Sequence, residues 1–185
     1  MHNIFDTLFQ EKDLCPVTLL FLPVYYMSEC VMYLNSLFGT STIEACMHSA
    51  LCSGQDEHVI NITIMELKKQ NPRIRFVLTT SIAGMGFDPE NVTQVIHAFP
   101  PRNLSQYLQE IGRAGPQGES AKAILYYGNR DIAKHVPGIN ENIINYCRNE
   151  DSCLKNVLLS TFGFEKDTSI AGCFLLLNMQ IYLFM

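Results

Sequence analysis

The sequence predicts an α/β domain built on a parallel β-sheet, followed by a small helical subdomain. Short apolar runs alternate along the chain with longer segments in which apolar residues recur at helical spacing, as in parallel sheets covered by helices. The clearest run is Val17–Leu22 (VTLLFL), which lies between two prolines and is apolar enough to be covered on both faces. Hydrophobic residues make up 48% of the 185 residues and charged residues 17%, which is typical of a globular chain.

Five segments have the apolar and β-branched composition of buried strands. The predicted strands are Val17–Leu22, Thr42–His48, Arg75–Thr80, a strand that starts at Val92 and stops before Pro100, and Ala121–Tyr127 as the last strand of the sheet.

Helices are predicted where apolar residues lie three or four positions apart and where capping residues or glycine mark the ends. The predicted helices are a short amphipathic helix within residues 1–16, Glu29–Phe38 after a Ser28 cap, Gln55–Gln70, a helix capped by Asn103 or Ser105, a short helix at Gly128–Ile132, Pro137–Arg148, and Cys153–Thr161 after a Ser152 cap.

The helix capped by Asn103 or Ser105 ends in a glycine-rich turn that holds Arg113 between Gly112 and Gly115. A guanidinium beside flexible backbone suits contact with a phosphate, because it donates two parallel hydrogen bonds to anionic oxygens. Taken alone, these residues also fit a plain helix end, where the arginine complements the helix dipole and glycine closes the last turn.

A second stretch, Thr79–Asp88 (TTSIAGMGFD), comes directly at the end of a predicted strand. Open α/β sheets bind their ligands at the carboxyl ends of the strands. Gly84 and Gly86 permit tight backbone paths that side chains would block. This stretch is therefore a second candidate for ligand contact.

Together with QEIGRAG at Gln109–Gly115, this stretch resembles motifs V and VI of superfamily 2 helicases, and most closely the RecQ family of ATP-dependent DNA helicases. The resemblance runs from about Leu19 to Cys173 and includes VIHAFPPRNLSQYLQEIGRAG, ILYYGNRDI and CLKNVLLSTFGF. It implies that residues 17–134 form a RecA-like lobe, the second ATPase lobe of such helicases, and that residues 135–173 are part of a zinc-binding subdomain. Residues 1–16 would be a linker or partial helix, and residues 174–185 an apolar tail outside the family.

The resemblance also implies roles for single residues. Those that would contact the nucleotide are Gly86, Asp88, Gln109 and Arg113, with Arg113 as the catalytic arginine. Those that would contact the DNA strand are Ser49 and Thr80. On the residues alone, Ser49 also fits an ordinary turn, and Asp88 fits the start of a turn before a proline.

Two features of the ATPase motifs depart from the family pattern. The 185 residues contain neither GxxxxGK(S/T) nor DExH, so we expect ATP and Mg²⁺ to bind only together with a RecQ-type first lobe. In motif VI, Pro116 stands where the family has a second arginine. We therefore expect that, even with a first lobe, the chain binds ATP but hydrolyses it poorly.

The carboxyl end departs as well. Cys153 and Cys173 match the first two of the family's four zinc ligands, but Leu176 and Met179 stand where further cysteines are expected. Cys147 is a conceivable third ligand, although a buried helix cysteine explains it better. The site is incomplete, and we expect no stable zinc.

The last residues, Phe174–Met185, are apolar apart from Asn178 and Gln180. A membrane-spanning helix needs about 20 residues, so this segment predicts an exposed tail and no membrane partner.

These observations favour the second lobe of a RecQ-like 3′-5′ DNA helicase, inactive as this chain alone, with single-stranded or forked DNA and a first helicase lobe as partners. The alternative is a non-catalytic interaction or nucleic-acid-binding module derived from such a lobe, and a weaker one is a protein tethered to a membrane by its tail. The net charge of −5 excludes a broad basic surface, so DNA contact has to be local. Seven scattered cysteines favour reduced thiols and an intracellular location, for which we expect the nucleus.

Overall fold

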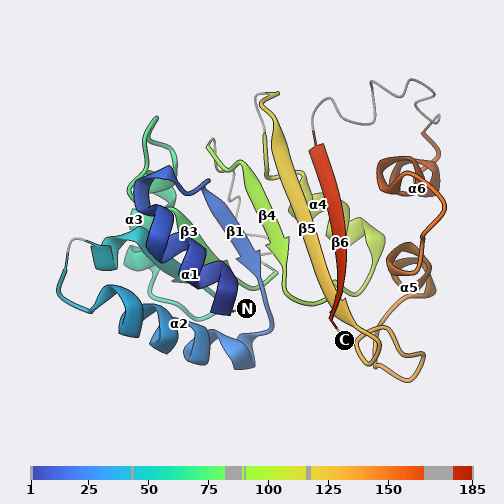
Figure 1. Cartoon of the computed structure of the whole chain (residues 1–185), viewed down its shortest axis with the longest axis horizontal. Coiled ribbons are helices and arrows are strands. Elements are labelled where there is room, and N and C mark those ends of the chain that lie inside the picture. Colours follow the sequence, from blue (N-terminus) through green and yellow to red (C-terminus); the bar gives the residue numbers. More distant parts are fainter. Residues whose placement is uncertain are drawn as a thin grey trace.

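The strands form one parallel six-stranded sheet in the order β2-β3-β1-β4-β5-β6 (Figure 1). The computed structural model describes residues 2–42, 44–81, 89, 91–115, 118–164 and 177–184. The strands are β1 Thr18–Phe21, β2 His48–Leu51, β3 Phe76–Thr79, β4 Gln94–His97, β5 Ala121–Gly128 and β6 Leu177–Phe184. The predicted parallel α/β fold is therefore confirmed.

Helices cover both faces of this sheet (Figure 1). They are α1 His2–Glu11, α2 Val24–Phe38, α3 Glu57–Leu67, α4 Leu104–Ile111, α5 Glu141–Cys147 and α6 Leu154–Thr161, with short 3₁₀ helices at Lys12–Leu14 and Glu44–Met47.

The continuous apolar run at β1 is explained by two hydrophobic cores, one on each face of the sheet. Leu19 and Phe21 pack into the core that β1 shares with α3, α4, α5 and α6, whereas Leu20 packs into the core shared with α1 and α2. Because neighbouring residues of a strand point to opposite faces, a strand between two cores needs apolar residues at nearly every position.

The amino-terminal segment is a packed part of the fold. The predicted amphipathic helix is α1, and its Phe5 and Leu8 are fully buried. The Phe5 ring meets the ring of Phe76 on β3 edge to face, with centroids 5.5 Å apart. The Tyr33 hydroxyl on α2 donates a hydrogen bond to Asp6 at 2.8 Å, which fixes α1 against α2.

Two predicted elements are wrong because side chains bond to the nearby backbone instead. The predicted strand Thr42–His48 is a turn and a 3₁₀ helix before β2, since the Thr42 hydroxyl bonds to Phe38 O and accepts from Ala45 N. No helix forms at Gly128–Ile132, where the Asp131 carboxylate accepts a hydrogen bond from Gly128 N at 2.6 Å and closes a turn.

Two helix starts also differ from the prediction. Helix α2 begins five residues earlier than Glu29, with Pro23 rather than Ser28 at its N-cap, a position where the missing N–H of proline removes no bond within the helix. Helix α5 begins at Glu141 rather than at Pro137, because Asn140 is its N-cap and accepts from Asn142 N at 2.9 Å.

The end of the chain, predicted as a tail outside the domain, continues the sheet over residues 177–184. They form β6, which pairs in parallel with β5 from Ala121–Leu177 to Gly128–Phe184, so β5 is not the last strand. An unpaired strand edge offers free N–H and C=O groups to any strand-forming segment, and the apolar end of the chain supplies one.

Helices α5 and α6 share the core beneath the sheet, with Ile143, Tyr146 and Leu158 buried.

Candidate functional site

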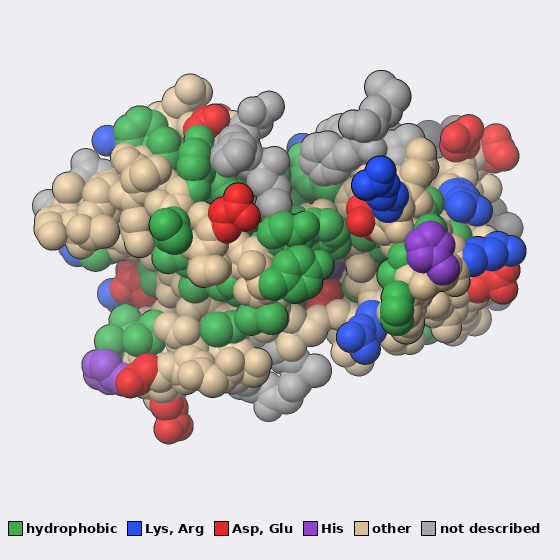
Figure 2. All heavy atoms as spheres, turned by 90° about the horizontal axis from the view of Figure 1, so that it is seen from below, with side chains coloured by type: hydrophobic (Ala, Val, Ile, Leu, Met, Phe, Trp, Pro, Cys, Tyr) green, Lys and Arg blue, Asp and Glu red, His purple; other side chains and the backbone are tan. Residues whose placement is uncertain are grey.

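An open cleft of about 960 Å³ lies at the carboxyl edge of the sheet, where β1, β3 and β4 end. Figure 2 views the molecule from this side. Three of the predicted site residues line the cleft, namely Thr80, Gln109 and Arg113. The structure therefore brings together residues from the two separate motifs, one at the end of β3 and one on α4.

Helix α4 is held in place at its start. Asn103, and not Ser105, is the N-cap: its side-chain oxygen accepts from Gln106 N at 2.8 Å. Gln109 lies in the last turn of α4, and Arg113 follows the C-cap Gly112. Both are accessible from the cleft, Gln109 exposed and Arg113 half-buried.

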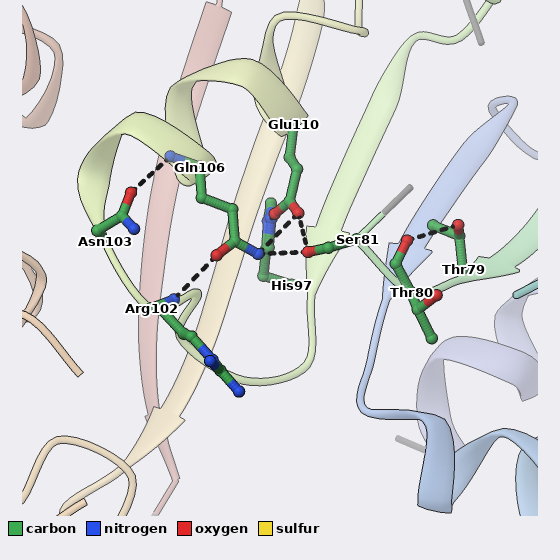
Figure 3. A network of polar contacts seen from close by, with 8 residues as sticks. All are labelled: Thr79, Thr80, Ser81, His97, Arg102, Asn103, Gln106 and Glu110. Carbon is green, nitrogen blue, oxygen red and sulfur yellow. Dashed lines mark hydrogen bonds and ion pairs between the residues drawn. The ribbon is translucent and has the colours of Figure 1, made fainter. Parts of the chain in front are cut away.

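A buried carboxylate joins α4 to the end of β3 (Figure 3). Glu110 is 5% exposed and accepts hydrogen bonds from Ser81 Oγ at 2.5 Å and from Gln106 Nε2 at 3.0 Å. Its second oxygen lies 2.6 Å from His97 Nε2. Gln106 Nε2 also donates to Ser81 Oγ. Ser81 and Glu110, which directly follow Thr80 and Gln109 in the sequence, are thus hydrogen-bonded to each other.

The His97 ring is enclosed by aromatic rings on the same core. It stacks on Phe21 with centroids 4.8 Å apart and 9° between the planes, and it meets Tyr107 edge-on at 5.0 Å. Tyr107 in turn contacts Tyr146 of α5 at 5.4 Å, and burial raises the pKa of the Tyr107 hydroxyl. The position of His97, the partner of Glu110, is therefore fixed by aromatic residues of β1, α4 and α5.

The Glu110 carboxyl gives the fold a pH dependence. Burial alone would raise its pKa, but the hydrogen bonds from His97, Ser81 and Gln106 outweigh burial, and the pKa is lowered from its ordinary value of 4.5. The folded protein therefore binds this proton more weakly than the unfolded chain does. The stabilisation is complete above about pH 4.5 and is lost as the pH falls through the lower folded pKa.

We expect the free energy of unfolding of the wild-type chain to fall below about pH 4.5 more steeply than that of Glu110→Gln, in which this group cannot titrate. Urea unfolding at a series of pH values measures both slopes. Parallel slopes for the two proteins would show that Glu110 contributes no acid sensitivity.

Other predicted site residues lie elsewhere. Ser49 is in the middle of β2, and its hydroxyl is 2.8 Å from the Thr63 hydroxyl of α3, so it does not line the cleft. Ser53, two residues beyond the end of β2, lines the cleft instead. Gly86 and Asp88 lie outside the described residues, as does Pro116.

The metal-ligand predictions are tested only in part. Cys153 is the N-cap of α6 and is disulfide-bonded, which differs from the expected reduced thiol, while Cys173 lies outside the described residues. Cys147 is buried in α5, and burial raises the pKa of its thiol to about 12, which disfavours the thiolate that zinc needs. Within the described part of the chain, no three His, Cys, Asp or Glu side chains are grouped as metal ligands.

The lack of a stable zinc stays a prediction. Metal analysis of the purified protein after mild dialysis should find well under one zinc per chain, because two or three thiolates hold zinc far more weakly than four. One zinc per chain, lost in Cys153→Ser, would contradict it.

The fold and the cleft define a class: a RecA-like lobe that presents an arginine-bearing helix end beside the end of a strand. The chain matches the helicase conserved C-terminal domain over residues 15–118, more than half of its length, and belongs to that family. Within the family it is RecQ-like, as its curated relatives show.

Two of these relatives are DNA helicases. The ATP-dependent DNA helicase RecQ of Bacillus subtilis is 31% identical over 117 residues, which are 55% of this chain and 20% of that protein. The RecQ-like DNA helicase BLM of Xenopus laevis is 34% identical over 160 residues, 76% of this chain and 11% of that protein. The chain thus spans a fifth or less of the length of these two relatives.

Solved structures agree in fold. Domain 2 of the DEAD-box helicase Mss116p, bound to an RNA duplex, has a TM-score of 0.58 at 14% identity and covers 98% of this chain and 57% of that one. The Mycobacterium smegmatis helicase Lhr, bound to single-stranded DNA and AMP-PNP, has a TM-score of 0.55 at 21% identity over 68% of this chain and 16% of that one. No helix in the described ranges is long and apolar enough to cross a membrane.

Proposed function

We propose that this chain acts as the second ATPase lobe of a RecQ-like DNA helicase, with ATP bound between it and a first lobe and single-stranded or forked DNA bound along the carboxyl edge of its sheet. The observation that carries the proposal is the direct bond between the two sides of the cleft. Ser81, next to Thr80, donates to Glu110, next to Gln109, so the residues proposed to face DNA and nucleotide flank one hydrogen-bonded pair.

The nucleotide side of the cleft suits a phosphate group. Gln109 offers an amide and Arg113 a guanidinium, both donors to anionic oxygens, and both line the cleft. ATP supplies the phosphoanhydride, and Arg113 would stabilise the negative charge that develops on it. We assign Gly86 and Asp88 to this side by resemblance. Mg²⁺ would be held by the first lobe.

The nucleic-acid side is centred on Thr80. Its hydroxyl follows β3 directly, and its backbone N–H donates to Leu51 O at 3.3 Å, which fixes the residue at the rim of the sheet. A hydroxyl in this place can donate to a DNA phosphate. Ser49 stays a candidate, although its hydroxyl is already paired with Thr63. The curated relatives are DNA helicases by name, which supports DNA as the partner. A nuclear location stays a prediction.

The purified chain alone should bind single-stranded DNA weakly but should neither hydrolyse ATP nor unwind DNA, because a P-loop lysine and magnesium-binding carboxylates are absent from the sequence. Phosphate release with and without oligo-dT, next to fluorescence anisotropy of labelled oligo-dT, measures both properties. Steady ATP turnover that oligo-dT stimulates in the pure chain would contradict the assignment, and complete lack of DNA binding would contradict its nucleic-acid part.

A further inference from the structure

Three aromatic rings form a ladder beside the cleft, and the outermost ring is open to solvent. Tyr26 and Phe99 are stacked almost parallel, with centroids 5.1 Å apart and 5° between the planes. Tyr25 leans on Tyr26 at 4.6 Å and is 69% exposed. Tyr25 and Tyr26 open α2, while Phe99 follows β4, so two elements hold the rings at the carboxyl edge of the sheet.

The same cleft carries positive charge. Arg102 and Arg130 line it together with Arg113, and within the described ranges neither Arg102 nor Arg130 is in an ion pair. Figure 3 shows the Arg102 side chain directed away from the Glu110 network.

The two carboxylates of the cleft are already engaged. Glu110 is buried among its three partners, and Asp131 accepts from Gly128 N. The cleft is thus lined by three arginines and by two carboxylates that already accept hydrogen bonds, although the net charge of the whole chain is −5. Hydrophobic side chains gather near the middle of the face seen in Figure 2.

A solvent-exposed ring beside guanidinium groups fits a ligand that has both a flat apolar face and anionic groups. Nucleic acid has both, but the bases of a duplex are stacked and paired and offer no free face at the side of the helix. Unpaired bases of a single strand do, and stacking on an aromatic side chain is tolerant of sequence because every base has a π-face.

We propose that Tyr25, backed by Tyr26 and Phe99, is a stacking platform for one unpaired base of a single nucleic-acid strand, whose phosphates reach Arg102 and Arg130. This inference deepens the proposed function and rests on the assignment of the DNA side to this edge of the sheet. It adds base contact to the phosphate contact expected at Thr80. The lobe would then hold the strand by a base as well as by its backbone.

The test uses the full chain and oligo-dT that carries one 2-aminopurine, a base whose emission falls when it stacks. Tyr25→Ala should weaken binding by about tenfold and abolish the quenching, whereas Tyr25→Phe should keep both. Met32→Ala is the matched control, because Met32 is an equally exposed side chain of the same helix that does not line the cleft. An abasic oligonucleotide of the same length should bind wild type and Tyr25→Ala alike.

The outcomes separate this inference from the proposed function. If wild type binds oligo-dT and Tyr25→Ala binds it equally well with equal quenching, the platform is wrong and the DNA side of the lobe stands. If wild type binds neither oligonucleotide, the nucleic-acid part of the proposed function fails. Competition by millimolar ATP that is lost in Tyr25→Ala would show a nucleotide site instead, and it would overturn the platform. Phe99→Leu removes the ring that stacks on Tyr26, and it should likewise weaken oligo-dT binding and reduce the quenching.

Discussion

In a chimera that joins this chain to the first lobe of the Bacillus subtilis RecQ helicase, Pro116→Arg should raise the rate of ATP hydrolysis by about 10³-fold. An arginine at the nucleotide stabilises the charge that develops on the transferred phosphoryl group, and removing one such arginine changes turnover by about 10³ to 10⁵. Proline has neither the charge nor a donor, and it restricts the backbone of the turn. Arg113 alone then supports only slow hydrolysis. Steady-state phosphate release at saturating ATP measures the change.

Arg113→Ala should remove most of the activity that remains in the Pro116 chimera, because Arg113 lines the cleft. Arg73→Ala is the matched control, since Arg73 is an exposed arginine just before β3, at the opposite edge of the sheet. Equal rates with proline and with arginine at position 116 would show that a second arginine is dispensable here. Loss of activity in Arg73→Ala would point to a general effect of charge.

Glu110→Ala should lower the free energy of unfolding by about 3 kcal/mol, a large part of the stability of a domain of this size. The substitution leaves the His97 ring, which is 1% exposed, without its partner among Phe21 and Tyr107. It also frees Ser81 and Gln106 from their shared acceptor. Urea unfolding, followed by circular dichroism, measures the loss as a lower midpoint at an unchanged slope.

Two controls separate the buried network from an ordinary ion pair. Glu110→Gln keeps an acceptor and should lose about half as much, because neutral hydrogen bonds are roughly half as strong as charge-assisted ones. Glu66→Ala removes a carboxylate whose partner, Lys69, is largely exposed, and it should cost about 1 kcal/mol or less. If Glu110→Ala costs no more than Glu66→Ala, the network does not hold α4 to the sheet.

The sheet follows from the sequence where composition decides. The run at Val17–Leu22 predicts a strand covered on both faces, and β1 at Thr18–Phe21 is buried at every position. Elements that depend on one side-chain bond were predicted wrongly, as at Thr42, where the hydroxyl closes a turn that no periodicity reveals. Strand β6 could not be predicted, because the composition of an apolar segment does not show that it will pair with the free edge of β5.

Part of the candidate site could also be predicted from the sequence. The motifs point to Thr80, Gln109 and Arg113, and the fold brings these three residues to one cleft. The Glu110–His97 pair was missed, although each is a polar residue at an apolar position, one on the buried face of α4 and one in β4. Two such positions in neighbouring elements are a usable signal for a buried pair. The residues of the aromatic ladder come from separate elements, and only the fold shows that they meet.

The central claim is that the hydrogen bonds of Glu110 join the DNA side of the lobe to its nucleotide side. Its most direct test is the ATP hydrolysis rate of the chimera carrying Pro116→Arg, measured over a range of oligo-dT concentrations. We predict that oligo-dT stimulates hydrolysis, that Thr80→Val raises the concentration needed for half-maximal stimulation, and that Glu110→Gln lowers the stimulated rate. A rate that oligo-dT leaves unchanged, in a chimera that hydrolyses ATP and binds oligo-dT, would contradict the claim.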